Sequence, residues 1–227
     1  ALIRKETGIA VTSSNAELIK KSQVIVIAVK PQTIGAALDD LKKNLSTGKL
    51  VVSIAAGVKI KKIQKGIGNK AAVVRVMPNT PALVGKGMAA LARGEGVSAE
   101  QFKTAKEIFS SSGKTIEVKE KMINSITAIS GSGPAYVFQF MEILASAAEK
   151  LGFDKRTAEM LALQTFAGAV ALAEKSGEPP AVLRARVTSK GGTTHEAIEY
   201  MKKNGLDKIF VKAVFRCKKR AEELSRE

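Results

Sequence analysis

The chain has few of the side chains that carry catalysis and metal binding in most enzymes. Its 227 residues include one cysteine, one histidine and no tryptophan. Cys217 has no internal disulfide partner, and together with His195 it gives too few soft ligands for a zinc or copper site. No Ser-His-Asp arrangement can be argued from a single histidine. The sequence therefore disfavours hydrolysis by covalent catalysis, and we expect no bound metal.

Long apolar runs are also missing. No segment approaches the roughly 20 apolar residues that a membrane-spanning helix needs. The first residues, ALIRKETG, lack the charged, apolar and small-residue zones of a signal peptide. With 45% apolar residues the chain can form an ordinary packed core, either as one large domain or as two small ones. We expect a cytoplasmic protein without a membrane segment.

Positive charge is in excess, because 37 basic and 21 acidic residues give a net charge of +16. Such a surface would suit nucleic acid, acidic lipid or anionic small molecules. Aromatic residues make up only 4%, however, and lysine is scattered along the chain instead of forming arginine-rich blocks. The pattern favours a heavily charged, solvated surface over a nucleic-acid partner.

Strand and helix patterns alternate in the first half. Gln23–Val29 is a nearly continuous β-branched run, which predicts a strand buried on both faces. Leu50–Ala55 and Ala71–Val76 are two further strands, and helical spacing falls between them at 34–44 and 60–67. This alternation predicts a doubly wound, Rossmann-like α/β sheet. The elements expected to complete it are a strand at Gly87–Ala92, a helix at Ser98–Ser111 and a strand at Thr115–Val118.

From about Lys119 the strand signal disappears, and the rest predicts an all-α domain. Asp154 is placed to cap a helix, and Gly152 follows the last periodic residue of the one before it. We therefore expect domains at 1–119 and 120–227. Small residues line the predicted helices 134–151 and 155–176, which fits packing inside a bundle and packing against a second subunit equally well. The other expected helices are 122–129, 179–186, 194–204 and 206–227.

Three short segments rich in Gly, Ser, Thr, Asn and Pro lie at the edges of regular elements: Met77–Ala82, Ser130–Ala135 and Val187–Thr194. Free N–H groups at a helix start, together with neighbouring hydroxyls, can bind a carboxylate or phosphate. Any one segment alone is most simply a turn, whereas three in one chain favour a ligand site. His195, just after the third segment, is expected to face solvent in a first helical turn, and Cys217 to be a packed or surface residue.

These motifs resemble those of pyrroline-5-carboxylate reductase, the last enzyme of proline biosynthesis. The resemblance covers essentially the whole chain and is carried by the family's motifs in the family's order. They are Ala28-Val29-Lys30-Pro31, Ser53–Gly57 (SIAAG), Arg75–Pro81 (RVMPNTP), Ser130–Tyr136 (SGSGPAY) and Val187–Thr194 (VTSKGGTT).

The resemblance implies a Rossmann-like domain that binds NADPH or NADH, followed by an all-α dimerisation domain, with the active site between them. It also implies a homodimer, often assembled into a ring of dimers, and a small imino acid as substrate, with neither nucleic acid nor membrane as partner. Thr194 would be the catalytic residue, its hydroxyl bonded to the ring nitrogen. The remaining residues implied for the substrate are Ser132, Gly133, Ser189, Gly191, Gly192 and Thr193. Those implied for the cofactor are Asn15, Ala28, Val29, Lys30, Pro31, Ala56 and Asn79, the last near the nicotinamide.

The chemistry of this reaction fits a site without histidine or cysteine. The cofactor supplies the hydride and a protonated C=N carbon is already electrophilic, so the protein mainly positions the reactants. Glu142 is a weak candidate for protonating the imine and fits a structural charge better. Lys190 stands where many family members have proline, which adds a cation beside an anion site and frees the backbone there.

One expected feature is missing. The fingerprint G-x-G-x-x-G/A, which seats the cofactor pyrophosphate, does not occur. We expect the natural product to be longer at its N-terminus, because a sheet without its first strand would leave Gln23–Val29 exposed along one edge. The choice between NADPH and NADH is not encoded here. Two alternatives stay open: a related dehydrogenase of another small acid, and a non-catalytic oligomeric or nucleic-acid-binding protein.

Overall fold

A computed structural model describes residues 2–226, and the side chains of residues 4–226. Its contacts divide the chain into two compact units, each described by itself below. The first, here called the sheet unit, extends to Ser132 and resumes at Cys217. The second, the helical unit, is Gly133–Arg216. The predicted boundary at 119/120 marks where strands stop in the sequence, and as a domain boundary it stays a prediction.

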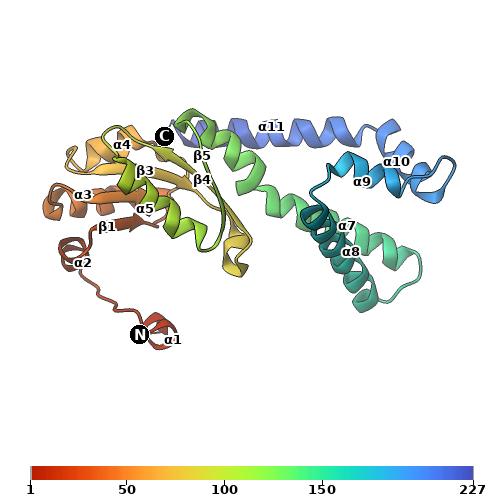
Figure 1. The fold of residues 1–227 in the computed structure, drawn as a ribbon, viewed down its shortest axis with the longest axis horizontal. Helices are drawn as coiled ribbons and strands as arrows, with labels where there is room; N and C mark the ends of the chain where they lie inside the picture. The colour runs from red at the N-terminus through yellow and green to blue at the C-terminus, as the bar shows by residue number, and fades with distance from the viewer. Residues whose placement is uncertain (1, 227) are drawn as a thin grey trace. The chain divides into compact units, whose positions relative to one another are not determined.

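The sheet unit is built on a five-stranded sheet in the order β1-β2-β3-β4-β5 (Figure 1). Its strands are β1 (Val24–Ile27), β2 (Leu50–Ser53), β3 (Ala72–Met77), β4 (Gly87–Arg93) and β5 (Gly113–Glu117). The strands β1, β2 and β3 are parallel, β4 runs antiparallel to β3, and β5 is parallel to β4. The predicted Rossmann-like α/β fold is confirmed. The antiparallel step, which the sequence did not predict, follows from the short link η2 (Thr80–Val84), because a parallel return needs a longer crossover.

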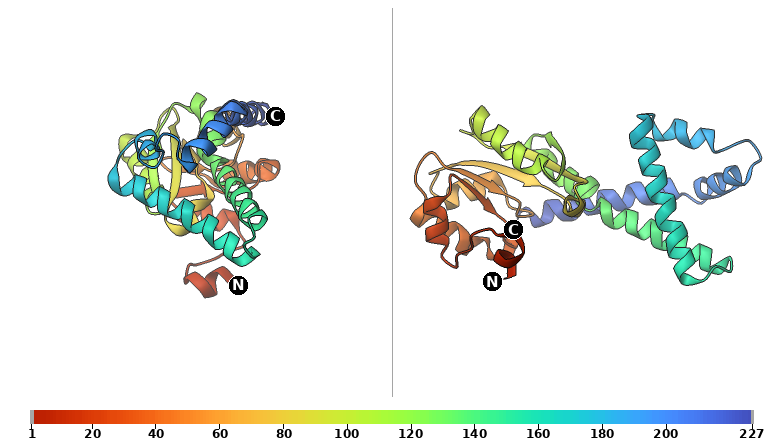
Figure 2. Two further views of the ribbon diagram at one scale, coloured as in Figure 1. Left: turned by 90° about the vertical axis from the view of Figure 1, so that its right-hand side faces the viewer. Right: turned by 60° about the horizontal axis from the view of Figure 1, so that its bottom comes forward.

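Helices cover both faces of this sheet, because alternate strand residues point to opposite sides. Val51 and Val73 face one core together with α2 (Asn15–Lys21), α3 (Ile34–Asn44) and α4 (Ile60–Gly66). Val52 and Val74 face the other core, which α5 (Ala99–Ser110) closes with Phe102 and Ala105. Figure 2 shows α5 on the opposite side of the sheet from α3 and α4.

The prediction that the first strand is buried on both faces is wrong. In β1, Ile25 and Ile27 are buried, but Val26 is 43% exposed. Within the described residues β1 pairs only with β2 and forms an edge of the sheet, as expected for this sequence. The core that α5 closes receives from β1 only Val24, which is half-buried. A β-branched run alone does not reveal whether both faces are covered.

Two local elements escaped the sequence prediction. The helix α2 was missed although Ser14 caps it by accepting from the Glu17 N–H, and the S-x-x-E spacing was a readable start signal. The single helix expected at 122–129 is instead a succession of three short elements. They are η3 (Glu120–Met122), α6 (Ile123–Ile126) and a π-helical turn, η4 (Thr127–Gly131).

The helical unit contains helices only within its described residues, as predicted for the second half. They are α7 (Gly133–Lys150), α8 (Lys155–Ser176), α9 (Pro180–Arg186), α10 (Thr193–Lys203) and the first part of α11 (Leu206–Leu224). The predicted cap at Asp154 is confirmed, since its carboxylate accepts from the Thr157 N–H at 3.1 Å. The helices α7 and α8 pack against each other through Ala145, Ala158 and Ala162. The remaining short helix, α1, is Leu2–Thr7.

Candidate functional site

The residues expected to bind the cofactor follow the carboxyl ends of parallel strands. Ala28–Pro31 come directly after β1, and Ala56 follows β2. Because β1, β2 and β3 are parallel, these ends and that of β3 share one edge of the sheet, the edge at which open α/β sheets bind ligands. All four residues of Ala28–Pro31 are exposed, as is Ala56, so this backbone is open to a ligand.

Asn15, also expected to bind the cofactor, is the first residue of α2 and is exposed. Its Nδ2 donates to Asp40 Oδ2 on α3 at 2.8 Å. The amide thus links two neighbouring helices of the sheet unit.

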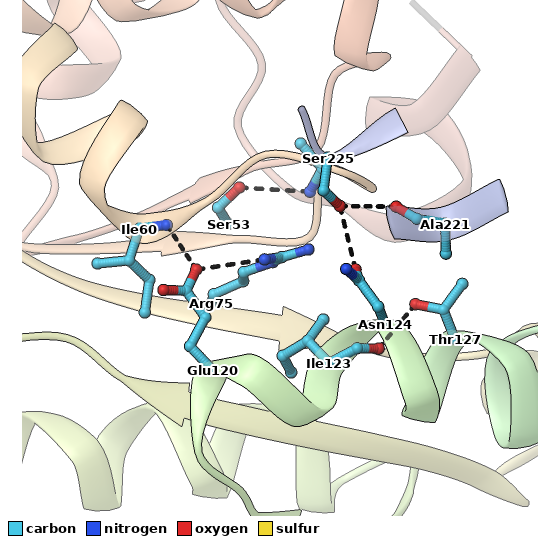
Figure 3. Close-up of polar contacts among 10 residues, drawn as sticks. Ser53, Ile60, Arg75, Glu120, Ile123, Asn124, Thr127, Ala221 and Ser225 are labelled. Carbon is cyan, nitrogen blue, oxygen red and sulfur yellow. Dashed lines mark hydrogen bonds and ion pairs between the residues drawn. The ribbon is translucent and has the colours of Figure 1, made fainter. Parts of the chain in front are cut away.

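A partly buried ion pair links β3 to η3 (Figure 3). Arg75 on β3 is 4% exposed, and its Nη1 donates to Glu120 Oε1 at 3.2 Å. The same oxygen accepts from the Ile60 N–H at 2.7 Å and so caps α4, whose own N-cap residue, Lys59, makes no side-chain bond. Burial lowers the pKa of the Arg75 guanidinium, and Glu120 acts in the opposite direction. One carboxylate therefore joins β3, α4 and η3.

The first and third Gly- and Ser-rich segments lie in different units, and the second spans the point in the chain at which one unit ends and the other begins. Within the sheet unit, Met77–Ala82 contacts Ser130 of the second segment. Asn79 Nδ2 donates to the Ser130 carbonyl at 2.9 Å, and Asn79 Oδ1 accepts from the Met88 N–H at 2.8 Å. Ser132, expected to contact substrate, accepts at its hydroxyl from the Cys217 thiol at 3.3 Å. Cys217 is thus packed against a predicted site residue, a connection that its place in the sequence did not reveal.

The third segment, Val187–Thr194, lies in the helical unit and leads into α10. Gly191 has a φ of +71°, a left-handed conformation that side chains rarely adopt. Gly192 is the N-cap residue of α10 and makes no side-chain cap. A Cβ built on Gly192 would lie 2.6 Å from Ser189 Oγ. The loop thus brings the Ser189 hydroxyl against the start of α10, whose first N–H groups have no side-chain cap from the N-cap position.

Thr193 and Thr194 occupy the first turn of that helix, Thr193 exposed and Thr194 half-buried. His195 follows them and is half-buried, so it is less open than predicted. Gly133 is the first residue of α7, and Glu142, about one turn beyond Phe138, is exposed within this chain. Among the described residues, no three His, Cys, Asp or Glu side chains gather in a way that could hold a metal ion.

A hollow in the sheet unit lies away from these residues. It has a volume of about 550 Å³ and opens at the amino ends of β2 and β3, beside Lys49, Lys70 and Glu95. None of the expected site residues lines it. Ligands of open α/β sheets bind at the opposite, carboxyl ends of the strands, where the expected cofactor residues lie.

Comparison with known proteins bears directly on these loops. Residues 120–224 match the family described as pyrroline-5-carboxylate reductase dimerisation, and residues 1–57 match NADP oxidoreductase, coenzyme F420-dependent. The pyrroline-5-carboxylate reductase of Methanosarcina acetivorans is 38% identical over 99% of this chain and 83% of its own length. That of Pseudomonas aeruginosa is 41% identical over 99% of this chain and 83% of its own. The chain belongs to the pyrroline-5-carboxylate reductase family.

Solved structures of pyrroline-5-carboxylate reductases agree. The Coxiella burnetii enzyme superimposes with a TM-score of 0.93 at 41% identity, over 99% of this chain and 84% of that one. The Plasmodium falciparum enzyme, solved with NADP bound, has a TM-score of 0.87 at 37% identity, over 94% and 81%. As in the sequence prediction, no helix among the described residues is long and apolar enough to cross a membrane. The fold is thus that of the reductase family in both units.

Proposed function

We propose that this protein reduces 1-pyrroline-5-carboxylate to L-proline with NADPH or NADH, the last step of proline biosynthesis. The observation that carries the proposal is the match to pyrroline-5-carboxylate reductases along 99% of the chain. The positions of the polar loops support it, because they follow strand ends and begin helices, where anionic ligands are held. No separate feature of the described residues favours another small acid or a nucleic acid.

The sheet unit has a surface suited to a dinucleotide. Small residues, Ala28 and Ala56, leave the backbone accessible after β1 and β2, and Lys30 adds a cation for phosphate. When bound, the nicotinamide cofactor supplies the hydride. Ala28–Pro31, Ala56 and Asn15 hold the ribose and phosphates in this proposal.

The loop before α10 holds the substrate carboxylate. The N–H groups at the start of α10 carry the positive end of the helix dipole, the Ser189 hydroxyl lies against the N-cap residue Gly192, and Thr193 is the first residue of the helix. The left-handed turn at Gly191 and the close approach at Gly192 let the backbone reach the anion. Ser132 and Gly133 contribute from the second polar segment.

Thr194 is the catalytic residue in this proposal. Its hydroxyl hydrogen-bonds to the ring nitrogen and orients the imine carbon toward the hydride donor. A nitrogen that gains a proton while its carbon gains a hydride becomes a neutral amine, so no covalent bond to the protein is needed. Positioning of this kind supplies much of the rate, because small misplacements of the carbon slow the transfer steeply.

The protein works as a homo-oligomer in this proposal, with 120–227 as the dimerisation and substrate domain and 1–119 as the cofactor domain. The match of 120–224 to a dimerisation family supports a dimer. The ring of dimers, the cytoplasmic location and the lack of a nucleic-acid partner stay predictions.

A substrate panel tests the function. The purified enzyme is mixed with NADPH or NADH and either pyrroline-5-carboxylate or a 2-keto acid, or with NADP⁺ or NAD⁺ and a 3-hydroxy acid, and cofactor absorbance is followed. We expect oxidation of reduced cofactor only with pyrroline-5-carboxylate, with proline as product. Turnover of a keto acid, or of a hydroxy acid with oxidised cofactor, without turnover of the imine would overturn the proposal. Tight DNA binding with a steep salt dependence would favour the nucleic-acid alternative.

A further inference from the structure

The carbonyl of Ser130 lacks its ordinary helical partner. In an α-helix it would accept from the backbone nitrogen of residue 134. Residue 134 is proline, which has no N–H. The chain is also π-helical here, with the Ser132 N–H donating to the Thr127 carbonyl at 2.7 Å. The Ser130 carbonyl therefore needs a donor from outside the helix, since a half-buried carbonyl without one is costly.

Asn79 supplies that donor. Its Nδ2 is 2.9 Å from the Ser130 oxygen, and its Oδ1 accepts from the Met88 N–H at 2.8 Å. The half-buried amide thus joins the first residues of β4 to the π-helical turn, and both its nitrogen and its oxygen are committed to backbone groups.

The two residues after Ser130 are also held from outside the turn. A Cβ built on Gly131 would lie 2.6 Å from the Met77 methyl carbon, so the end of β3 packs directly on this residue. The Ser132 hydroxyl accepts from the Cys217 thiol at 3.3 Å. Three consecutive residues are therefore fixed by side chains from β3, the loop after it, and α11.

We propose that Asn79 is a positioning residue for the substrate side of the site and acts without contacting the cofactor. Its amide fixes the turn at Ser130, and the fixed turn places the Ser132 hydroxyl. The role assigned to Ser132 rests on the proposed function. The bridge through Asn79, meaning its hydrogen bonds to the Ser130 carbonyl and the Met88 N–H, does not depend on that function. This role replaces the one implied by the family resemblance, which placed Asn79 near the nicotinamide end of the cofactor.

Two substitutions separate the two halves of the bridge. Asn79→Asp keeps an oxygen for the Met88 N–H but turns a second oxygen toward the Ser130 carbonyl. Asn79→Ala removes both bonds. The matched control is Asn44→Asp on α3, where Nδ2 likewise donates to a backbone carbonyl, that of Asp40, at 3.0 Å.

We expect both Asn79 variants to lower kcat/KM for pyrroline-5-carboxylate by about tenfold to a hundredfold, because a shifted Ser132 misplaces the substrate. The cofactor Kd, measured by nicotinamide fluorescence without substrate, should change by less than about twofold. Amide hydrogen exchange at Met88 should speed up in Asn79→Ala and stay slow in Asn79→Asp. Asn44→Asp should match the wild type in all three measurements.

A cofactor Kd that weakens as much as kcat/KM would show that Asn79 contacts the cofactor and overturn the proposal. Unchanged kinetics, or unchanged Met88 exchange in Asn79→Ala, would overturn it as well. If the wild type fails to reduce the imine, the proposed function fails, while exchange at Met88 and Ser132 still tests the bridge. Circular dichroism checks that each variant is folded.

Discussion

The two units of this protein bury apolar surface to very different extents. In the sheet unit, large side chains such as Ile63, Ile67 and Leu91 are fully buried between the sheet and its helices. Among the described residues of the helical unit, the buried apolar side chains are Ala145, Ala158 and Ala162 alone. Large apolar side chains on the same helices are exposed in the single chain, among them Phe138, Ile143, Met160, Leu163, Val170 and Leu172.

This difference indicates that the two units reach stability by different routes. The sheet unit has its own core on both faces of the sheet. The helical unit exposes far more apolar surface than a stable monomeric bundle tolerates. The match of 120–224 to a dimerisation family accounts for it, because a second copy can cover these side chains. Most of the residues proposed to bind substrate therefore lie in a unit whose stability we expect to depend on association.

The first prediction concerns the division of chemistry between the units. Thr194→Ala in the helical unit should lower kcat by about a hundredfold, the typical cost of losing one hydrogen bond that strengthens in the transition state. The cofactor Kd should not change, because the residues proposed to bind the cofactor belong to the sheet unit. Steady-state kinetics and nicotinamide fluorescence measure the two quantities. Thr165→Ala on α8, whose hydroxyl only bonds the Leu161 carbonyl, is the control. Full activity in Thr194→Ala would remove this residue from the mechanism.

The second prediction concerns association. Leu163→Asp on α8 places a charge where the side chain is 57% exposed in the single chain. We expect the dimer Kd to rise by about a hundredfold, since a central apolar contact of an interface contributes about 2 to 3 kcal/mol. Sedimentation velocity measures it.

Ile108→Asp on α5 of the sheet unit, 40% exposed, is the matched control and should leave the oligomer intact. If Leu163→Asp remains fully associated and Ile108→Asp does not, the assignment of association to the helical unit is wrong.

The third prediction concerns the stability of the sheet unit. Glu120→Ala removes both the partner of buried Arg75 and the cap of Ile60, so unfolding free energy should fall by about 2 kcal/mol. Glu120 is itself 32% exposed, which keeps the cost below that of a fully buried pair. Urea denaturation measures it. Glu117→Ala removes a more exposed ion pair with Arg93 and should lower the unfolding free energy much less. Equal losses in the two variants would argue against a special role for Glu120.

Much of this fold was readable from sequence periodicity, and the exceptions have physical causes. The strands β2 and β3 and the helices α7 and α8 followed from apolar spacing, because a covered face leaves a regular pattern. The exposed face of β1 and the antiparallel β4 depend on neighbours that the pattern does not encode. The π-helical turn could be suspected from Pro134, which removes a donor, but its partner Asn79 lies 51 residues away in the chain.

The candidate site, like the fold, could be predicted from the sequence only in part. The loops themselves were visible as clusters of Gly, Ser and Thr, since those residues supply turns and free N–H groups. Nothing local indicated that Cys217 contacts Ser132, 85 residues earlier, or that Glu120 caps Ile60. Contacts between distant segments appear only once the chain is folded.

The smallest predicted effect is on how the thermal stability depends on pH. Hydrogen bonds from the Thr157 hydroxyl and N–H lower the pKa of Asp154 below its ordinary value of 3.8. Because the pKa of Asp154 is lower in the folded state, the charged carboxylate stabilises α8 fully at a pH above the ordinary pKa. This stabilisation is lost as the pH falls through the lowered pKa of the folded state. The thermal midpoint should therefore fall less steeply between about pH 5 and pH 2 in Asp154→Asn than in the wild type. Glu159→Gln on the same helix is the control. An unchanged slope in Asp154→Asn would contradict the assignment.

Isotope transfer tests the central claim most directly. The enzyme is given pyrroline-5-carboxylate and NADPH that carries deuterium on the transferring face of nicotinamide C4, and the proline formed is analysed by mass spectrometry. If the protein is a hydride-transferring reductase, each proline gains a single deuterium, on the ring carbon that was doubly bonded to nitrogen. Proline without deuterium there, or no proline while the cofactor is still oxidised, would contradict the account.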